Sequence, residues 1–301
     1  MKVVFGIHNI KRLKNAVVAL GVFDGVHLAH QRILRQAVSR AKGIKGKAVV
    51  VTFDPHPQKK KSIYSLEHRL RLIASLGIDT CVVIRFSPAF AETSPGNFIK
   101  NILLHKIKAK YIFIGKNFRF GRGAAGDFKT LKSLARRLNF KARVFPVLRA
   151  AGSAVSSTYI RYLIASGKLK TAEKLLGRRV SVLGTVIKGT SLGRLMGFPT
   201  ANINPHHEVL PPSGIYAVKI IYKDRELKGV SYIGTKPTFR PQANKSIEVH
   251  VFNFHKKIYG EYLEIQFLGK IRQDRKFANI QALAAAIKND VKIAKRRFPR
   301  H

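Results

Sequence analysis

The sequence of 301 residues has few acidic side chains, a single cysteine and no tryptophan. Only 15 residues are Asp or Glu against 57 Lys or Arg, which gives a formal net charge of +42 at pH 7. This balance favours anionic partners, but nucleic acid, phosphorylated metabolites and acidic membranes all qualify. Because Cys81 stands alone, these residues cannot form an intramolecular disulfide or a cysteine-cluster metal site, as is typical of proteins in a reducing cytoplasm.

Long apolar runs are also missing. No stretch approaches the roughly 20 consecutive apolar residues of a membrane-spanning helix, and the N-terminal segment lacks the apolar core and cleavage site of a secretion signal. We therefore expect a cytoplasmic protein that does not span a membrane. Hydrophobic residues still make up 46% of the chain and are clustered, which predicts a folded protein with a sizeable core rather than a disordered basic tail.

Residues 1–180 alternate short β-type runs with helix-like stretches. AVVALGVF at 16–23 precedes a helix-like stretch at 30–43, and further β-type runs lie at 48–53, 81–86, 111–115 and 142–148. Such alternation predicts an α/β domain whose parallel sheet has helices on its faces and presents binding loops at the carboxyl ends of its strands. Two short helices separated by Gly167 close this half.

Residues 181–301 contain β-type runs separated by turns, with no helical pattern between most of them. The runs lie at 180–189, 214–223, 226–234, 246–254 and 262–271, and a helix-like stretch follows at 277–298. This pattern predicts a small antiparallel sheet or barrel with a terminal helix.

The first half carries GVFDGVHLAHQ at 21–31, where a hydrophobic strand turns into a helix that bears His27 and His30. Backbone amides at a helix N-terminus favour a phosphate, and two imidazoles one turn apart can donate to the same anion. A zinc site would need a third ligand, which no nearby cluster supplies. Ordinary surface histidines are the alternative, and the residues alone leave it open.

Three more polar segments follow expected strands of the first half. They are TFDPHP at 52–57, IGKNFRFGRGAAGD at 114–127 and VSSTYIR at 155–161. A turn cap at Asp54 or a flexible loop at GRGAAG would explain any one of them, whereas four strand ends in order favour a ligand site.

The second half combines a glycine-rich loop with Pro199-Thr200-Ala201-Asn202. Glycines let a backbone approach phosphates, and a hydroxyl and an amide oxygen two residues apart can face one hard cation. Strand alternation puts Glu248 and His250 on one face of the run at 246–254, where a carboxylate can accept a proton from an alcohol. A solvent-facing acid on an antiparallel strand is the alternative.

Together these segments resemble the bifunctional riboflavin kinase/FMN adenylyltransferases, the bacterial FAD synthetases. In that family the nucleotidyltransferase module has HxGH, TFxPHP, DFRFG and SSTxIR segments in this order, and the riboflavin kinase module has a PTAN segment. The resemblance implies a Rossmann-like FMN adenylyltransferase domain over residues 1–180 and a riboflavin kinase domain over 181–301. The second domain would phosphorylate riboflavin to FMN, and the first would transfer AMP from ATP to FMN, giving FAD and pyrophosphate.

The resemblance also implies roles for individual residues. It implies that the catalytic residues of adenylyl transfer are His27, His30 and Arg161, and that the general base of the kinase is Glu248. The residues implied to bind ATP or its phosphates are Gly21, Phe23, Asp24, Gly25, Ser156, Ser157, Thr158, Gly184, Gly189 and Gly193. The residues implied to bind flavin are Asp54, Pro55, Asn117, Phe118, Arg119, Asp127, Arg272 and Asp274. The residues implied to bind Mg²⁺, which would accompany ATP, are Thr200 and Asn202.

Three residues depart from the family pattern. Ala29 stands in place of the glycine of HxGH, Asn117 in place of the aspartate of DFRFG, and Asp274 where RxE has glutamate. The first two motivate an alternative in which only the kinase works. The charge motivates another, a basic nucleic-acid-binding protein on the same scaffold. We expect small-molecule partners, riboflavin, FMN and ATP, and no specific nucleic acid, because the aromatic residues lie inside strand-like runs rather than in exposed arrays with arginine.

Overall fold

The computed structural model describes residues 1–10, 13–57, 61–189, 193, 196–206, 208–235 and 245–298. The chain divides into two compact units, Met1–Ser62 with Leu66–Ser157, and Ile63–Ser65 with Thr158–His301. The short helices at 157–176 therefore belong almost wholly to the second unit.

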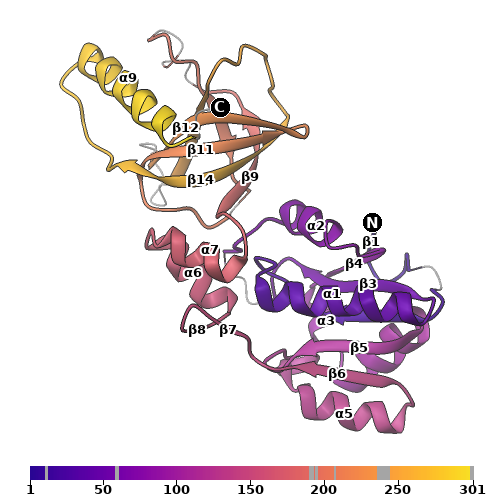
Figure 1. Cartoon of the computed structure of the whole chain (residues 1–301). Helices are drawn as coiled ribbons and strands as arrows, with labels where there is room; N and C mark the ends of the chain where they lie inside the picture. Colours follow the sequence, from indigo (N-terminus) through magenta and orange to yellow (C-terminus); the bar gives the residue numbers. More distant parts are fainter. Residues whose placement is uncertain are drawn as a thin grey trace. The chain divides into compact units, whose positions relative to one another are not determined.

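The first unit contains the expected parallel sheet (Figure 1). Its six strands lie in the order β1-β4-β3-β2-β5-β6. They are β1 (Lys2–Phe5), β2 (Ala16–Leu20), β3 (Lys47–Asp54), β4 (Thr80–Arg85), β5 (Ala109–Gly115) and β6 (Lys141–Phe145). The α/β prediction is confirmed, and β1 is an edge strand that the sequence did not indicate.

Helices cover both faces of this sheet. The longer ones are α1 (Leu28–Gly43), α2 (Leu66–Ala74), the π-helix η1 (Phe98–Lys106) and α5 (Phe128–Arg137). Shorter elements are α3 (Pro88–Ala91), α4 (Pro95–Asn97), η2 (Arg122–Ala124), β7 (Arg149–Ala150) and β8 (Ser153–Ala154).

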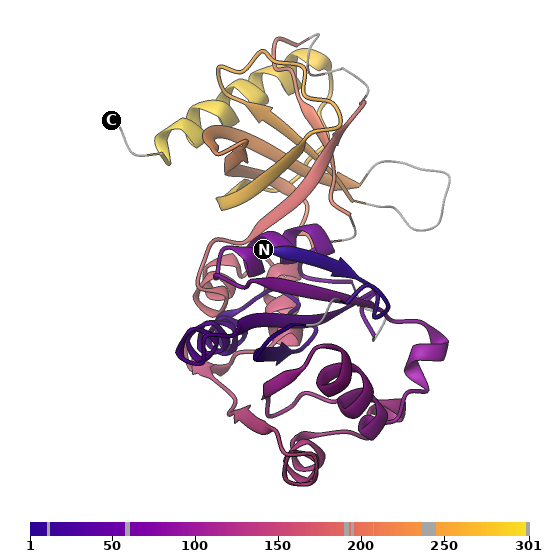
Figure 2. The same ribbon diagram turned by 90° about the vertical axis from the view of Figure 1, so that its right-hand side faces the viewer.

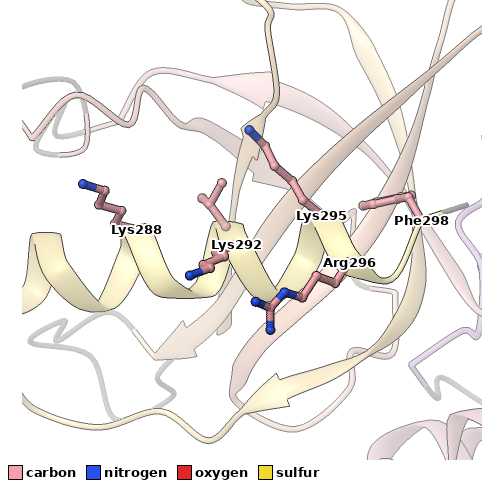
Figure 3. A pocket seen from close by; sticks show the side chains of 6 residues that line it. Lys288, Lys292, Lys295, Arg296 and Phe298 are labelled. Carbon is pink, nitrogen blue, oxygen red and sulfur yellow. The ribbon is translucent and has the colours of Figure 1, made fainter. Parts of the chain in front are cut away.

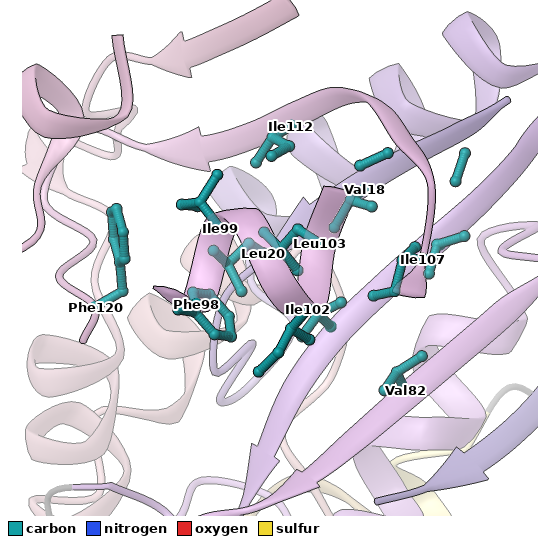
Figure 4. Close-up of a cluster of buried hydrophobic side chains, with 14 of the residues drawn as sticks. Val18, Leu20, Val82, Phe98, Ile99, Ile102, Leu103, Ile107, Ile112 and Phe120 are labelled. Carbon is teal, nitrogen blue, oxygen red and sulfur yellow. The ribbon is translucent and has the colours of Figure 1, made fainter. Parts of the chain in front are cut away.

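The alternation of side chains along β2 explains the two cores of the sheet. Val17 and Ala19 join the core under α1 and α2, which also contains the buried Cys81. Val18 and Leu20 point to the opposite face and pack against η1 and α5 (Figure 4). Because both faces are buried, the central strands are apolar throughout rather than alternating.

The strand order reverses at β2. From β2 the chain continues to β3 and β4 on one side and later to β5 and β6 on the other. Ligands of open α/β sheets bind beyond the carboxyl ends of strands at such a switch point. The loops that follow β2, β3 and β5 are three of the four segments that the sequence singles out.

The second unit is a closed antiparallel barrel in the order β10-β13-β12-β11-β14-β9, which confirms the predicted fold class. Its strands are β9 (Ser181–Ile187), β10 (Ala201–Asn204), β11 (Gly214–Tyr222), β12 (Arg225–Thr235), β13 (Lys245–Val251) and β14 (Tyr262–Arg272). Its helices are α6 (Ser157–Ala165), α7 (Leu169–Leu176) and α9 (Ile280–Arg296).

Helix α9 lies along the outside of the barrel, where it contacts β11, β12 and β14 (Figure 2). It buries Ala286, Asp290 and Ala294 against the strands. The exposed side of the helix carries the basic residues Lys288, Lys292, Lys295 and Arg296. A pocket on this helix is lined by Lys288, Val291, Lys292, Lys295, Arg296 and Phe298 (Figure 3).

Membrane-spanning helices and metal-binding clusters are both missing from the described part of the chain. Among these ranges no helix has the length and apolar character needed to cross a membrane. The same ranges hold no cluster of three or more His, Cys, Asp or Glu side chains arranged to bind a metal ion.

Candidate active sites

The turn between β2 and α1 places His27 and His30 together, as the sequence predicts. His27 is the N-cap of α1, and its Nδ1 accepts a hydrogen bond from the backbone N–H of His30 at 3.4 Å. The two rings stack with their centroids 3.6 Å apart. A ring nitrogen that accepts a hydrogen bond carries no proton, so the proton of the neutral His27 ring lies on Nε2, as a donor.

The backbone of this turn is left-handed at three positions. Phe23, Gly25 and Val26 have φ values of 54°, 80° and 39°. A Cβ atom on Gly21 would lie 3.1 Å from the ring of Phe23, so glycine leaves that ring its space. Ala29, by contrast, lies within the first turn of α1, where right-handed geometry suits alanine better than glycine. The departure at position 29 therefore does not strain the helix.

Asp24 is 2% exposed, and its backbone carbonyl accepts a hydrogen bond from Ser157 Oγ at 2.9 Å. This bond links the β2–α1 turn to the residue with which α6 begins. Of the residues predicted to surround pyrophosphate, Ser156 and Ser157 belong to the first unit, whereas Thr158 and Arg161 belong to the second. All but Ser156 lie within α6, and Thr158 is exposed.

The segment after β3 presents Asp54, whose peptide bond to Pro55 is cis. The Asp54 carboxylate is half-exposed and forms an ion pair with the buried Arg69 at 3.2 Å. Next to it begins a chain of contacting aromatic rings at the carboxyl ends of β3, β4 and β5. Its members are Phe53, Phe86, Phe90, Phe98, Phe118 and Phe120.

The segment after β5 carries the other predicted flavin contacts of the first unit. Asn117 is exposed, and Phe118 stacks on Phe120. Asp127 is the N-cap of α5 and accepts hydrogen bonds from the backbone of Thr130 and Lys129. These bonds, led by that from Thr130, lower the pKa of the Asp127 carboxyl, and Arg119 forms an ion pair with it at 3.4 Å. A structural role at the helix start thus accounts for Asp127 without a ligand.

In the barrel, three of the predicted kinase residues come together. Asn202 on β10 is paired in register with Glu248 on β13, and Thr200 Oγ1 donates to Glu248 Oε2 at 3.4 Å. His250 follows on the same face of β13, with Nδ1 2.9 Å from the Pro199 carbonyl oxygen. A hydroxyl, an amide and a carboxylate from two segments far apart in the sequence therefore meet beside the paired strands β10 and β13.

Glycines allow the neighbouring backbone to approach this group closely. A Cβ atom on Gly189 would collide with the Asn202 side chain, and one on Gly193 would contact Phe198 and Thr200. Gly184 meets the backbone of β10 in the same way. Residues 190–192 and 194–195 of the glycine-rich loop before Pro199 lie outside the described residues.

Arg272 and Asp274 at the end of β14 have partners within the protein. Arg272 forms a two-pronged ion pair with Asp290 on α9, at 2.9 Å from Nε and 2.8 Å from Nη2. Asp274 accepts a hydrogen bond from the Tyr232 hydroxyl at 2.9 Å. Tyr232 is paired in register with Glu248. Burial, together with the bond to Asp274, raises the pKa of Tyr232 to about 12, so its hydroxyl remains a donor at neutral pH.

Sequence reasoning missed Tyr232, Asp290 and Arg69, which contact the predicted residues directly. No local motif marks them, because their partners lie between 15 and 47 residues away. The signals available in the sequence were an arginine within an amphipathic helix, for Arg69, and a single acid within a basic helix, for Asp290.

The two units combine a switch-point site with a helix N-terminus and histidine donors, and a barrel site with a carboxylate beside oxygen ligands. These features are typical of an ATP-dependent transferase with two candidate sites. Family models match accordingly, that of FAD synthetase over residues 9–159 and that of riboflavin kinase over residues 176–298.

Curated relatives match over the full length. Bifunctional riboflavin kinase/FMN adenylyltransferases of Buchnera aphidicola (from Schizaphis graminum), Haemophilus influenzae and Escherichia coli K12 are 36%, 34% and 32% identical, each covering 99% of this chain and 98–99% of the relative. A crystal structure described as a macrolide-efflux protein from Streptococcus pneumoniae has the same fold, with a TM-score of 0.84 and 27% identity over 99% of this chain and 100% of that one. The chain belongs to the family of bifunctional riboflavin kinase/FMN adenylyltransferases.

Proposed function

We propose that this protein makes FAD from riboflavin in two ATP-dependent steps. Residues 181–301 phosphorylate riboflavin to FMN, and residues 1–180 then transfer AMP from ATP to FMN with release of pyrophosphate. The observation that carries the proposal is the pairing of Glu248 with Asn202 and Thr200 on the barrel, in a chain whose other unit presents His27 and His30 at a switch point.

For the kinase step, the nucleophile is a neutral primary alcohol, the 5′-hydroxyl of riboflavin. Glu248 is suited to accept its proton, because a carboxylate within hydrogen-bond reach of an attacking hydroxyl lowers the barrier to transfer. The Thr200 hydroxyl, 3.4 Å from Glu248 Oε2, donates a hydrogen bond that orients the carboxylate. The glycines at 189 and 193 let the neighbouring backbone lie directly against Asn202, Phe198 and Thr200, where a side chain would collide.

The donor set also fits Mg²⁺. Thr200 and Asn202 offer a hydroxyl and an amide oxygen, and Mg²⁺ is commonly held by few protein oxygens together with substrate phosphates. When bound, the ion would neutralise charge that develops on the transferred phosphoryl group. Thr200 and Asn202 would hold it, and the strand of Asn202, β10, is fixed on both sides by β9 and β13.

For the adenylyl step, FMN already brings an ionised phosphate as nucleophile, so the site needs alignment and charge neutralisation more than a general base. His27 Nε2 and the amides at the start of α1 are donors for the phosphates of ATP. Ser156, Ser157, Thr158 and Arg161 would hold the departing pyrophosphate. The partly exposed rings of Phe86, Phe90 and Phe118 offer a surface on which an isoalloxazine ring can stack.

A product assay tests both steps in one experiment. Purified protein with riboflavin, ATP and Mg²⁺ should yield FMN and then FAD by chromatography. Supplying FMN directly and obtaining neither FAD nor pyrophosphate would leave a kinase alone. Absence of both products across metal ions and flavin redox states would refute the proposal.

We further propose that the protein works in the cytoplasm, on small molecules, without a specific nucleic-acid partner. The charge of +42 attracts any polyanion. Nonspecific binding to phosphates weakens steeply with salt, so RNA binding should disappear as salt rises. Tight RNA binding at physiological salt together with no flavin binding would favour a nucleic-acid-binding protein instead.

A further inference from the structure

Arg69 on α2 is a buried arginine outside all of the predicted motifs. It is 2% exposed, and its side chain reaches from the helix to the carboxyl ends of two adjacent strands. Nη1 donates to the Val22 carbonyl at 2.7 Å and to Thr52 Oγ1 at 3.3 Å. Nη2 donates to the Phe53 carbonyl at 3.5 Å and to Asp54 Oδ1 at 3.2 Å.

These partners are the last residues before the two loops of the adenylyltransferase site. Val22 follows β2 and precedes the left-handed turn that leads to His27, and Asp54 ends β3 next to Pro55. Thr52 Oγ1 donates to the same Val22 carbonyl at 2.9 Å, so this carbonyl accepts hydrogen bonds from both strand β3 and helix α2. The rigid, planar guanidinium of Arg69 therefore fixes the start of both loops, the one after β2 and the one after β3.

The charge of Arg69 also matters at this place. Burial lowers the pKa of Arg69, and the nearby Asp24 and Asp54 carboxylates oppose that shift. Two carboxylates beside a site for polyphosphates would repel the ligands. The buried Arg69 cation offsets that repulsion, and its ion pair at 3.2 Å orients the half-exposed Asp54 carboxylate. Burying the charge of Arg69 costs free energy even with such partners. Because the charge lies at the strand ends beside the candidate site, we assign it a role beyond packing.

We propose that Arg69 is a positioning residue of the adenylyl transfer site. Its side chain holds the loop after β2 and the Asp54 carboxylate in the positions that binding of ATP and FMN requires. This inference rests on the proposed function of the first unit. Arg69 acts through these two loops and not by contact with a reacting atom.

The test compares substitutions of two arginines on the same helix. Arg69→Met removes the charge and the donors with little change in length, and Arg69→Lys keeps the charge but not the fork. Arg71 lies on α2 in an exposed ion pair with Glu67 at 2.9 Å, so Arg71→Met is the matched control. Each full-length variant is assayed separately for FMN formation from riboflavin and for FAD formation from FMN.

We expect Arg69→Met to lower kcat for FAD formation by about 100-fold, since small misplacements around a reacting centre have effects of this size. KM should change less than kcat, FMN formation should stay at the wild-type level, and Arg69→Lys should recover part of the loss. Arg71→Met should leave both activities unchanged.

A double-mutant cycle with Asp54→Asn separates positioning from stability. If Arg69 acts through Asp54, Asp54→Asn should have a much smaller effect in the Arg69→Met background than in the wild type. Additive effects, or a loss that disappears when the assay is cooled below the melting point of the variant, would overturn the inference. So would a wild-type rate in Arg69→Met. If the wild-type chain itself makes no FAD from FMN, the proposed function fails instead.

Discussion

The ion pair between Arg272 and Asp290 should dominate the stability of the barrel near its proposed flavin contacts. Both carboxylate oxygens of Asp290 are engaged, and the side chain of Asp290 is 3% exposed while that of Arg272 is 21% exposed. Asp290→Asn keeps the shape but removes the charge, and it turns an amide N–H₂ group toward the guanidinium. The variant leaves Arg272 as a partly buried cation without its counterion.

The size of the effect follows from this burial. Breaking a buried pair by removing one partner costs roughly 3–5 kcal/mol, and we expect about 3 kcal/mol because water still reaches part of Arg272. For a unit of this size that corresponds to a fall of about 10 °C in the melting temperature. Calorimetry, with kinase activity measured after heating, would report it. The control Glu226→Gln breaks the pair with Lys219, at 2.6 Å in the same barrel, in which the acid is 55% rather than 3% exposed, and should have little effect.

The explanation by an uncompensated charge on Arg272 also predicts the stability of a double variant. If the loss comes from that charge, then Arg272→Met in the Asp290→Leu background should restore much of the stability, because apolar replacements of a buried pair are often neutral. A melting temperature unchanged by Asp290→Asn would refute this explanation, as would a double variant no more stable than Asp290→Leu alone.

Three further predictions concern the two sites. Glu248→Gln should lower FMN formation by about 10²–10⁴-fold and leave FMN-to-FAD conversion intact in the same preparation, and equal loss of both would contradict separate sites. His30→Ala should do the reverse, with FAD formation reduced about 10²-fold and FMN formation unchanged in a chromatographic assay. Because the pKa of Tyr216 and of Tyr232 is raised to about 12 by burial, the folded state binds these protons more tightly than the unfolded one, so stability should fall as pH rises from 10 toward 12. Ultraviolet titration should show one fewer late-titrating group in Tyr232→Phe, and ordinary titration of all tyrosines in the folded protein would contradict this assignment.

Much of the architecture could be predicted from sequence because hydrophobic pattern and period are local properties. The apolar run at 16–23 indicates a strand buried on both faces, and the structure places its first five residues in the buried strand β2. The edge strand β1 was missed, since only Val4 of its four residues is buried. Strand β10 was also missed, because its residues in the segment PTAN were interpreted for their chemistry and the strand covers only Ala201–Asn204.

The sites divide in the same way. Residues at or shortly after the end of a strand, such as Asp54 and His27, could be predicted as candidates from the order of elements, since parallel strands end at one edge of the sheet. Thr200 and Glu248 could be brought together only by family resemblance, because the register of β10 against β13 depends on packing of the whole barrel. Arg69 and Asp290 belong to no motif, and only the folded chain shows what their side chains reach.

Because Cys81 on β4 is buried, a cysteine introduced at the surface of this protein can be labelled selectively. Cys81 is fully covered in the core under α1 and α2, and burial raises the pKa of its thiol to about 12, so it resists maleimides and alkylating reagents at neutral pH. A cysteine introduced on the surface of each unit would therefore be modified alone, with the native thiol left in place. Fluorophores at such a pair of positions would report, by energy transfer during turnover, whether the adenylyltransferase and kinase units move as FMN passes from one to the other.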